Sequence, residues 1–281
     1  MKEGNMIMST VALTQNKEKV IKKRKLTTTR GIIVFRALFL PILVLIVWEL
    51  LTKIGILPSL LFSSPSLIVS RGIELAASGK LWDHMEISLI RALLGFLLGG
   101  ALGLLFGILV GMNSRSEHYL NPTLQMIRTV PLLAITPLFI LWFGFGELSK
   151  VLLISLGSFF PLYLQAFLGI RNIDNKLFEV AKVMEYNRFH QITKLMLPSA
   201  LPNILLGVRL SLSVAWMCLV AAELLGADRG IGFMIQDARS FMQTDTVFVG
   251  IIIFALAGKL SDSFVRFLEQ RLLKWQDNFK A

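Results

Sequence analysis

The stretch LFEVAKVMEYNRFHQITKLMLPSALP, from Leu177 to Pro202, decides how the rest of this chain is interpreted. Its first half places apolar residues at the i, i+3, i+4, i+7 spacing of one helix face, namely Leu177, Val180, Ala181 and Met184. The pattern breaks at residues 185–187, restarts as a short amphipathic piece and reaches Leu197-Pro198. A charged helical hairpin of this kind, set between long apolar spans, is either a solvated loop or a docking element for a soluble partner.

The composition around this hairpin is that of a membrane protein. The 281 residues are 54% hydrophobic and only 17% charged, and the mean hydropathy is +0.67, whereas a soluble domain carries more charge and shorter apolar runs. The formal net charge of +11 would suggest a nucleic-acid partner in a soluble protein, but in a membrane protein it indicates basic cytoplasmic ends. The single cysteine, Cys218, excludes an intrachain disulfide.

Six apolar spans follow one another along the chain. They are predicted at residues 31–52, 87–111, 119–143, 150–170, 200–225 and 245–267. Lysines and arginines cluster before the first span, within the hairpin and after the last span, which places all three regions in the cytoplasm. Residues 1–30 are predicted to be a disordered basic tail, and residues 226–244 an external loop. Ser64-Pro65 is predicted to open a short surface helix that ends near Gly79.

Glycine and proline distinguish the second and third spans. The second span has a glycine at every fourth position, which predicts a smooth face for close helix approach along Gly95, Gly99, Gly103, Gly107 and Gly111. The third span is interrupted by Pro122, Pro131 and Pro137, each of which removes a backbone donor and kinks or breaks a helix. Because broken backbone at membrane depth is tolerated where it lines a cavity, Pro131 and Pro137 make this span the first candidate for lining a solute path.

No catalytic constellation is visible in the sequence. His84, His118 and His190 lie in separate predicted loops, so neither metal-ligand spacing nor a catalytic triad is supported. No G-x-x-x-x-G-K-[ST] phosphate loop is complete, so this chain is not expected to hydrolyse ATP.

Ionisable residues inside the spans are the remaining candidates for function. Arg209 lies near the middle of the fifth span, where a charge costs roughly 2.5–3.5 kcal/mol, so it is expected either in a structural ion pair or on the path of an anion. Glu223 lies on the same span about four turns away, too far to pair with it, and is a second candidate for the path. Arg91, Arg128 and Asp262 lie nearer the span ends, from which side chains can snorkel to the interface.

The hairpin resembles the EAA loop of ABC importer permeases. That family pattern starts with E-A-A, continues through three residues to a glycine, and closes with an apolar-x-L-P sequence. This chain has Glu179-Val180-Ala181 at the start and Leu195-Met196-Leu197-Pro198 at the end. The family's glycine falls on Glu185, where this chain departs from the pattern. Asn187 tolerates a left-handed conformation, so we expect it to make the turn instead.

The resemblance extends from about Trp48 to Trp275. It is carried by SLIRALLGFLLGGALGLLFG (88–107), TVPLLAITPLFILWFGFGELSK (129–150), FFP (159–161) and AAELLGADRGIGFMI (221–235). Together with the EAA loop, these segments are similar to the nitrate/sulfonate/taurine branch of the permeases.

This resemblance implies an all-α polytopic membrane protein with six transmembrane helices, in the type I ABC importer permease fold. It divides the chain into a cytoplasmic tail (1–30), a permease domain (31–270) with its coupling loop (171–198), and a C-terminal cytoplasmic tail (271–281). The implied location is the bacterial cytoplasmic (inner) membrane, multi-pass, with both termini cytoplasmic. The implied function is to form the translocation pathway for a small solute, an anion such as aliphatic sulfonate, taurine or nitrate.

The resemblance also implies partners. They are an ABC ATPase subunit, an extracytoplasmic substrate-binding protein and a second permease copy, with a homodimer expected. ATP and Mg would belong to the ATPase, so this chain is expected to bind no cofactor and to be a transport subunit rather than an enzyme. The residues matched to ATPase coupling are Glu179, Ala181, Lys182, Glu185, Asn187, Leu197 and Pro198.

Three other interpretations remain open at this point. The same machinery can serve another small solute, such as a thiamine-precursor pyrimidine. A secondary transporter driven by an ion gradient would show an inverted repeat and a carboxylate relay at mid-depth, and neither is visible. A membrane scaffold without a solute path would explain the glycine face but not the proline-broken third span.

Overall fold

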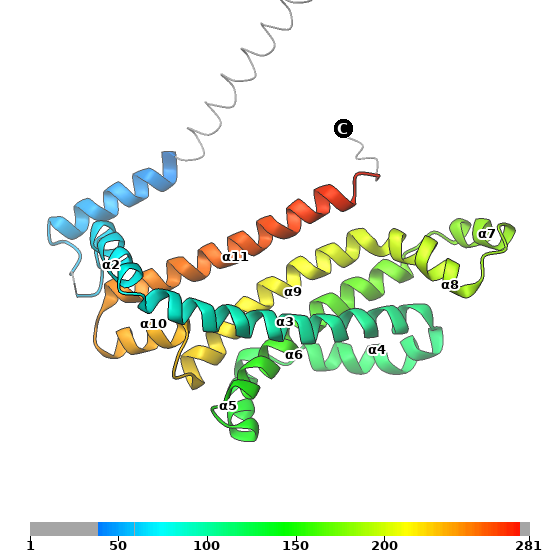
Figure 1. The fold of residues 1–281 in the computed structure, drawn as a ribbon, viewed down its shortest axis with the longest axis horizontal. Coiled ribbons are helices and arrows are strands. Elements are labelled where there is room, and N and C mark those ends of the chain that lie inside the picture. Colours follow the sequence, from blue (N-terminus) through cyan, green and yellow to red (C-terminus); the bar gives the residue numbers. More distant parts are fainter. Residues whose placement is uncertain (1–38, 59, 276–281) are drawn as a thin grey trace, which may run out of the picture. The chain divides into compact units, whose positions relative to one another are not determined.

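The computed structural model describes residues 39–58 and 60–275, and the elements it assigns there are helices (Figure 1). The predicted basic tail, the start of the first predicted span and residues 276–281 lie outside the described residues. The chain divides into two compact units, residues 1–67 and 68–281, which are described separately below.

The first unit contains a helix over residues 39–53 and the start of α2 (Pro65–Ala77). The Glu49 carboxylate accepts hydrogen bonds from the backbone N–H of Ser66 (3.0 Å) and from its hydroxyl (2.8 Å). The Ser64 hydroxyl accepts from the backbone N–H of Leu67 at 3.4 Å. The prediction of a helix opened by Ser64-Pro65 is therefore confirmed, because the serine satisfies an N–H of the first turn.

Three long helices lie side by side at the centre of the second unit: α3 (Lys80–Met112), α6 (Glu147–Arg171) and α9 (Leu197–Gly226). The five glycines of the predicted face, spaced four residues apart, are all buried and turn toward α6. A Cβ built on Gly99 would collide with the carbonyl oxygen of Ser155, and one on Gly103 with that of Phe159. At these positions the two helices meet backbone against backbone, which only glycine allows.

The third predicted span is broken, as its prolines predict. It consists of α4 (Ser114–Arg128) and α5 (Leu132–Phe143), which are bent by 93°. The break falls at Pro131, whose extended backbone precedes the first turn of α5. Pro122 and Pro137 lie inside the two helices without ending them. In Figure 1, α4 runs beside α3 and α5 turns away from the central helices.

The region between the last two predicted spans is not simply a loop. It contains the helix α10 (Ile231–Ser240), so the prediction of an external loop at residues 226–244 was wrong there. One face of α10 is apolar, because Ile231, Met234 and Ala238 are spaced i, i+3, i+7 and are buried. The charged residues between them make this helical pattern hard to recognise in the sequence. α10 packs against α9 and against the last helix, α11 (Thr244–Leu272).

Four helical stretches are long and apolar enough to cross a membrane, or five if the bent α4–α5 pair counts as one span. The four are Lys80–Met112, Glu147–Arg171, Arg188–Gly226 and Thr244–Leu272. The remaining predicted span, residues 31–52, begins outside the part of the chain that the structure describes. Six spans are consistent with this arrangement.

The three histidines lie on helices, so their assignment to loops was wrong. His84 belongs to α3, His118 to α4, and His190 to α8 (Arg188–His190). Within residues 39–58 and 60–275, no group of histidine, cysteine and acidic side chains could hold a metal ion.

Candidate coupling site and solute path

The hairpin between α6 and α9 begins with α7 (Asn175–Val183). Asp174 caps this helix by accepting a hydrogen bond from the backbone N–H of Lys176 at 3.0 Å. Most of the predicted apolar face points away from the rest of the chain. Of the four residues predicted to form this face, only Ala181 is buried, at 1% exposure. The side chains left exposed on and beside this face are Leu177, Val180, Val183, Met184 and Phe189.

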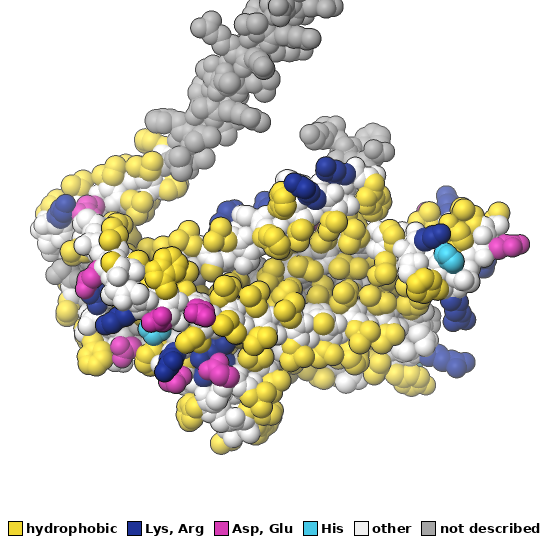
Figure 2. Space-filling view, in the orientation of Figure 1, with side chains coloured by type: hydrophobic (Ala, Val, Ile, Leu, Met, Phe, Trp, Pro, Cys, Tyr) yellow, Lys and Arg dark blue, Asp and Glu magenta, His cyan; other side chains and the backbone are white. Residues whose placement is uncertain are grey.

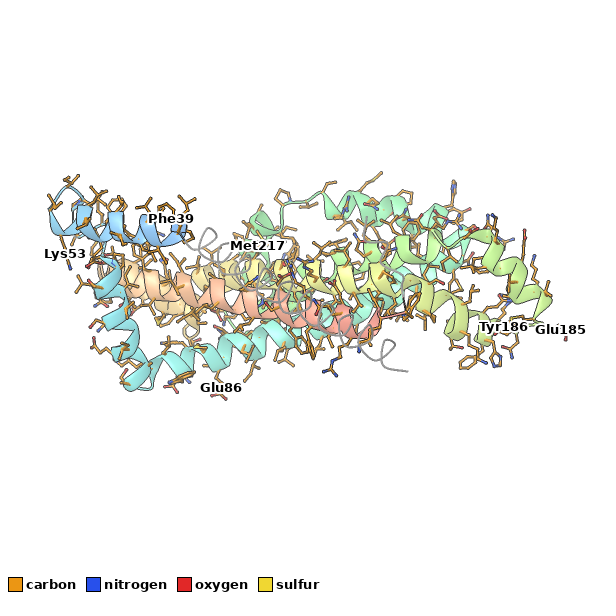
Figure 3. The ribbon with its side chains drawn as sticks, turned by 90° about the horizontal axis from the view of Figure 1, so that it is seen from above. Phe39, Lys53, Glu86, Glu185, Tyr186 and Met217 are labelled. Carbon is orange, nitrogen blue, oxygen red and sulfur yellow. The ribbon has the colours of Figure 1, made fainter. Side chains whose placement is uncertain are left out.

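The turn of the hairpin is made by Glu185, which stands where the EAA pattern has glycine. Its φ is +52°, in the left-handed region. The N–H of Glu185 bonds to the carbonyl of Lys182, and the N–H of Tyr186 to that of Ala181, both at 3.0 Å. This pair of bonds is the Schellman ending of a helix, whose left-handed position favours glycine. Figure 3 shows Glu185 and Tyr186 together at one end of the second unit.

The prediction that Asn187 makes the left-handed turn was therefore wrong. Asn187 has φ −67° and ψ 168°, which is extended backbone. Its side chain caps α8 instead, accepting from the backbone N–H of His190 at 2.8 Å. Asparagine is a favoured residue at both kinds of position, so its type alone did not decide between them.

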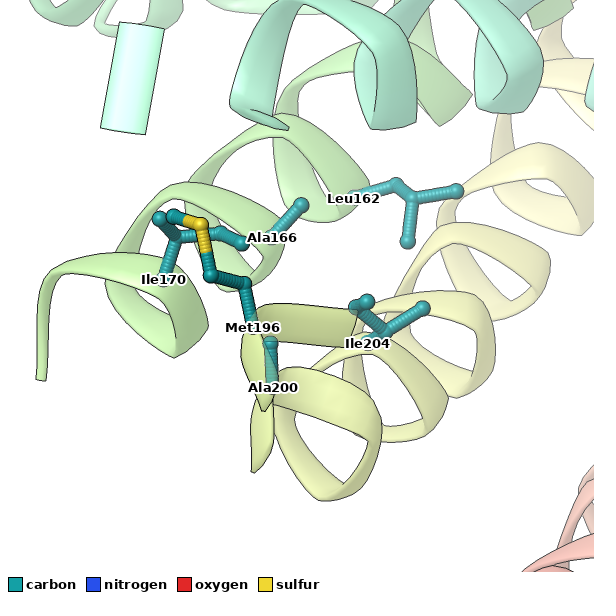
Figure 4. Close-up of a cluster of buried hydrophobic side chains, with 6 residues drawn as sticks. All are labelled: Leu162, Ala166, Ile170, Met196, Ala200 and Ile204. Carbon is teal, nitrogen blue, oxygen red and sulfur yellow. The ribbon is translucent and has the colours of Figure 1, made fainter. Parts of the chain in front are cut away.

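The second half of the hairpin connects to α9 without a break. After α8 the chain forms a π-helix, η1 (Gln191–Met196), which continues directly into α9 at Leu197-Pro198. Six buried residues join this junction to α6 (Figure 4): Leu162, Ala166, Ile170, Met196, Ala200 and Ile204. Phe178 of α7 packs against the same cluster. The second half of the hairpin is therefore packed onto two central helices, α6 and α9.

At the other end of the central helices lies a network that we call the outer charge cluster, formed by Ser88, Arg91, Glu147, Lys150 and Glu223. The Arg91 guanidinium bonds to Glu223 at 2.8 Å and to Glu147 at 2.6 Å. Arg91 is only 2% exposed, so the prediction that it snorkels to the interface was wrong. Figure 2 shows charged side chains gathered over this end of the molecule.

Glu223, a predicted path residue, is 1% exposed and is enclosed by this cluster. It also accepts hydrogen bonds from the Ser88 hydroxyl (2.8 Å) and from the backbone N–H of Gly232 (2.8 Å). A Cβ built on Gly230 or Gly232 would strike the Glu223 side chain. The carboxylate therefore fixes the start of α10 against α3 and α9, and the two glycines leave room for it.

Arg209, the other charged path candidate, pairs with Asp262 of α11. Asp262 also accepts from Arg266 at 2.9 Å. About two turns further along α9, Trp216 donates from its indole N–H to the Ser261 hydroxyl at 3.0 Å. Of the two roles that the sequence leaves open for Arg209, the structure provides the ion pair. Pro131 precedes α5 and Pro137 lies within it, and the α5 side chains Leu133, Leu141 and Trp142 are exposed.

One charged residue at similar depth was missed from the sequence. Lys259 lies near the middle of α11 and is exposed. Its position inside an apolar span was the signal that would have singled it out.

Comparisons with known proteins agree with this arrangement. Residues 99–274 match the family described as binding-protein-dependent transport system inner membrane component. A putative aliphatic sulfonates transport permease protein SsuC of Bacillus subtilis is 56% identical over 246 residues, which are 88% of this chain and 89% of that protein. A protein of the same name from Escherichia coli is 44% identical over 84% of this chain and 90% of its own length.

A taurine transport system permease protein TauC of Escherichia coli is 34% identical over 82% of this chain and 86% of its own length. A solved structure of an amino acid ABC transporter superposes with a TM-score of 0.59 at 16% identity, covering 70% of this chain and 96% of that one, and shows a common fold. The chain therefore belongs to the binding-protein-dependent inner membrane components, the permease subunits of ABC importers, within their sulfonate and taurine branch.

Proposed function

We propose that this permease forms the membrane path through which an ABC importer takes up aliphatic sulfonates. The observation that supports the solute class is the 56% identity, over 88% of this chain, to a relative whose name specifies aliphatic sulfonates. The taurine permease is less similar, at 34% identity. Both names describe solutes that carry a sulfonate group, so the path would have to accept that anion.

The proposed site of ATPase docking is the hairpin at residues 171–198. An unpaired apolar face on a charged helix fits a hydrophobic groove in a soluble partner. Val180, Val183 and Met184 are between 53% and 85% exposed, so the described part of the chain leaves them largely uncovered. Glu179 lies beside them, exposed and without an ion pair among the described residues, so it is available to a cation on the partner.

The rigid junction at η1 would transmit ATPase motion to the spans. In this proposal, closure of two ATPases moves two hairpins, and the cluster shared with α6 moves the central helices as a body. Two permease copies, the expected homodimer, would form the path between them. An extracytoplasmic binding protein would deliver the solute at the end that carries α10.

The proposed orientation places the hairpin and the C-terminal end of α11 in the cytoplasm. Among the described residues, the hairpin end carries basic side chains, including Arg171, Lys182 and Arg188. The opposite end carries acidic side chains, including Glu86, Glu147 and Asp245. An excess of lysine and arginine on one side is typical of the cytoplasmic side.

Reconstitution tests this function. Proteoliposomes that contain the permease, its ATPase and its binding protein should take up radiolabelled ethanesulfonate only when ATP is supplied to the ATPase side. Unlabelled taurine and nitrate are added as competitors, and the degree to which each inhibits ethanesulfonate uptake shows which solute the importer prefers. Uptake driven by an ion gradient without ATP, or uptake of a pyrimidine but of no sulfonate, would contradict the proposal.

A further inference from the structure

Among the described residues, two clusters of charged side chains lie on the membrane-length helices. In only one of them does the number of cations equal the number of carboxylates. The outer charge cluster contains Arg91 and Lys150 against Glu147 and Glu223, so its cations and carboxylates match. A second group, which we call the inner charge cluster, contains Arg209, Lys259, Asp262 and Arg266. Here a single carboxylate, Asp262, pairs with two of three cations, and Lys259 lies one turn before it on the same helix.

The pairing within the inner charge cluster leaves Lys259 without a counter-charge. Asp262 is bound by Arg209 through one carboxylate oxygen and by Arg266 through the other. Lys259 has no ion pair among the residues that the structure describes. An unmatched charge at membrane depth is costly, so it requires an anion, water or both.

The position of Lys259 on α11 separates it from the packed side of that helix. Gly250 and Val265, both buried, lie roughly on the opposite side of the helix at 3.6 residues per turn. Lys259 instead heads a stripe of polar residues at i, i+3, i+4 and i+7, which comprises Lys259, Asp262, Ser263 and Arg266. The other half of the same face is apolar, with Ile252 and Leu256 exposed.

This stripe is poorly placed for lipid. A lysine near a helix end can extend to the headgroups, but Lys259 lies near the middle of a helix of 29 residues. Ser263 and Asp262, on the same stripe, are polar side chains that contact with lipid would also disfavour. Polar side chains within spans typically face a water-filled path or another protein surface.

We propose that the inner charge cluster is the anion-binding part of the solute path, and that Lys259 is the residue that contacts the sulfonate group. Asp262 holds Arg209 and Arg266 in place, and the uncompensated ammonium of Lys259 supplies the attraction. The proposal rests on the sulfonate uptake proposed above. It adds the residues that would bind the anion and the helix face that would line its path.

Cysteine chemistry tests the site without depending on transport. Cys218, the only cysteine, is first replaced by alanine, and Ser263 is replaced by cysteine so that Lys259 stays in place. The water-soluble reagents are an anionic (sulfonatoethyl) and a cationic (trimethylammonioethyl) methanethiosulfonate. Ser263→Cys should react, with the anionic reagent favoured. Adding Lys259→Gln should lower the ratio of anionic to cationic rates at least tenfold, whereas Lys259→Arg should preserve it.

Leu260→Cys is the matched control, because Leu260 follows Lys259 directly, is 69% exposed and lies outside the polar stripe. It should not react with either reagent. If Ser263→Cys is as unreactive as Leu260→Cys, the stripe faces lipid or a second copy, and the proposal is wrong. A rate ratio that Lys259→Gln leaves unchanged would also overturn it.

Uptake separates this inference from the proposed function. Ethanesulfonate uptake per assembled complex should fall at least tenfold in Lys259→Gln and stay near the wild-type rate in Lys80→Gln, which removes an exposed lysine at the far end of the central helices. If the wild-type complex takes up no sulfonate, the proposed function fails. If the wild type transports and Lys259→Gln transports equally well, only the present inference fails.

Discussion

A single residue, Glu185, shows how this chain keeps the hairpin geometry without the family's glycine. The left-handed conformation is roughly 1–2 kcal/mol less favourable for a residue with a Cβ atom, and a glycine at that position avoids most of this conformational strain. The Schellman hydrogen bonds of Glu185 and Tyr186 hold the turn despite the strain. Glu185 therefore adopts the left-handed conformation that the family's glycine would favour, and we expect the departure to lower the stability of the turn.

We predict that Glu185→Gly stabilises the hairpin by about 0.5–1 kcal/mol. Hydrogen exchange of the amides in α7 should slow by about two- to five-fold, as that energy implies. Glu179→Gly is the control, because glycine in a helix interior costs up to about 1 kcal/mol and should accelerate the same amides. Faster exchange in Glu185→Gly would mean that the left-handed turn is not the strained point.

The buried carboxylate of Glu223 gives a second prediction at the residue scale. Glu223→Gln keeps the shape but leaves Arg91 with only Glu147 as a charged partner, at a cost of about 2–3 kcal/mol. Thermal unfolding of the purified protein in detergent should show a lower Tm. Glu147→Gln removes the half-exposed partner of the same arginine and should cost less than about 1 kcal/mol. Equal losses of stability in the two variants would show that burial of the carboxylate does not determine how much each ion pair contributes to folding.

Between elements, the closest approach is that of α3 and α6 along the glycine face. Even one methyl group at Gly103 would collide with the Phe159 carbonyl oxygen, and backbone cannot move aside as a flexible side chain can. We predict that Gly103→Ala lowers stability by about 1–3 kcal/mol and that Gly103→Leu prevents assembly. Folded yield after membrane extraction, followed by thermal unfolding, measures both effects.

Gly258 provides the control for this prediction. It lies inside α11, and nothing comes within 4 Å of a Cβ built on it. Gly258→Ala should therefore be neutral or stabilise the helix by about 0.5–1 kcal/mol. If the two alanine variants behave alike, the response reflects helix propensity rather than the contact between α3 and α6.

The elements that the sequence predicts well are those with a local signal. The glycine spacing, the break at Pro131 and the two-part hairpin each depend on neighbours within a few residues. The partners of Arg91 were not predictable in this way, because Glu223 is distant in the sequence and is brought near only by packing. The same holds for Arg209 and Asp262, whose helices must first be placed side by side. The helix α10 was missed because its charges obscured three buried apolar residues.

At the largest scale, the hairpin and the outer charge cluster lie at opposite ends of the second unit. The hairpin lies at one end of the central helices, where Figure 3 labels Glu185. The outer charge cluster lies at the other end, where Glu147 begins α6 and Glu223 lies in the last turn of α9. Helices α6 and α9 run between the two ends and share the cluster beside the hairpin. In the proposed function, a push on the hairpin would act on α6 and α9, while the balanced outer charge cluster keeps α10 fixed to α3 and α9.

The last prediction concerns Glu179 and the docking of the ATPase. Glu179→Lys reverses an exposed charge on α7 and buries nothing new, so folding and membrane insertion should be unchanged. If Glu179 meets a cation on the ATPase, the reversal replaces attraction with repulsion, which costs several kcal/mol at an interface. Co-purification of the ATPase with the tagged permease should therefore fall at least tenfold. Glu86→Lys makes the same charge change on α3, at the opposite end from the hairpin, and should leave co-purification intact. Equal recovery of the ATPase with both variants would place the docking contact elsewhere, whereas loss with both would point to net charge rather than to this contact.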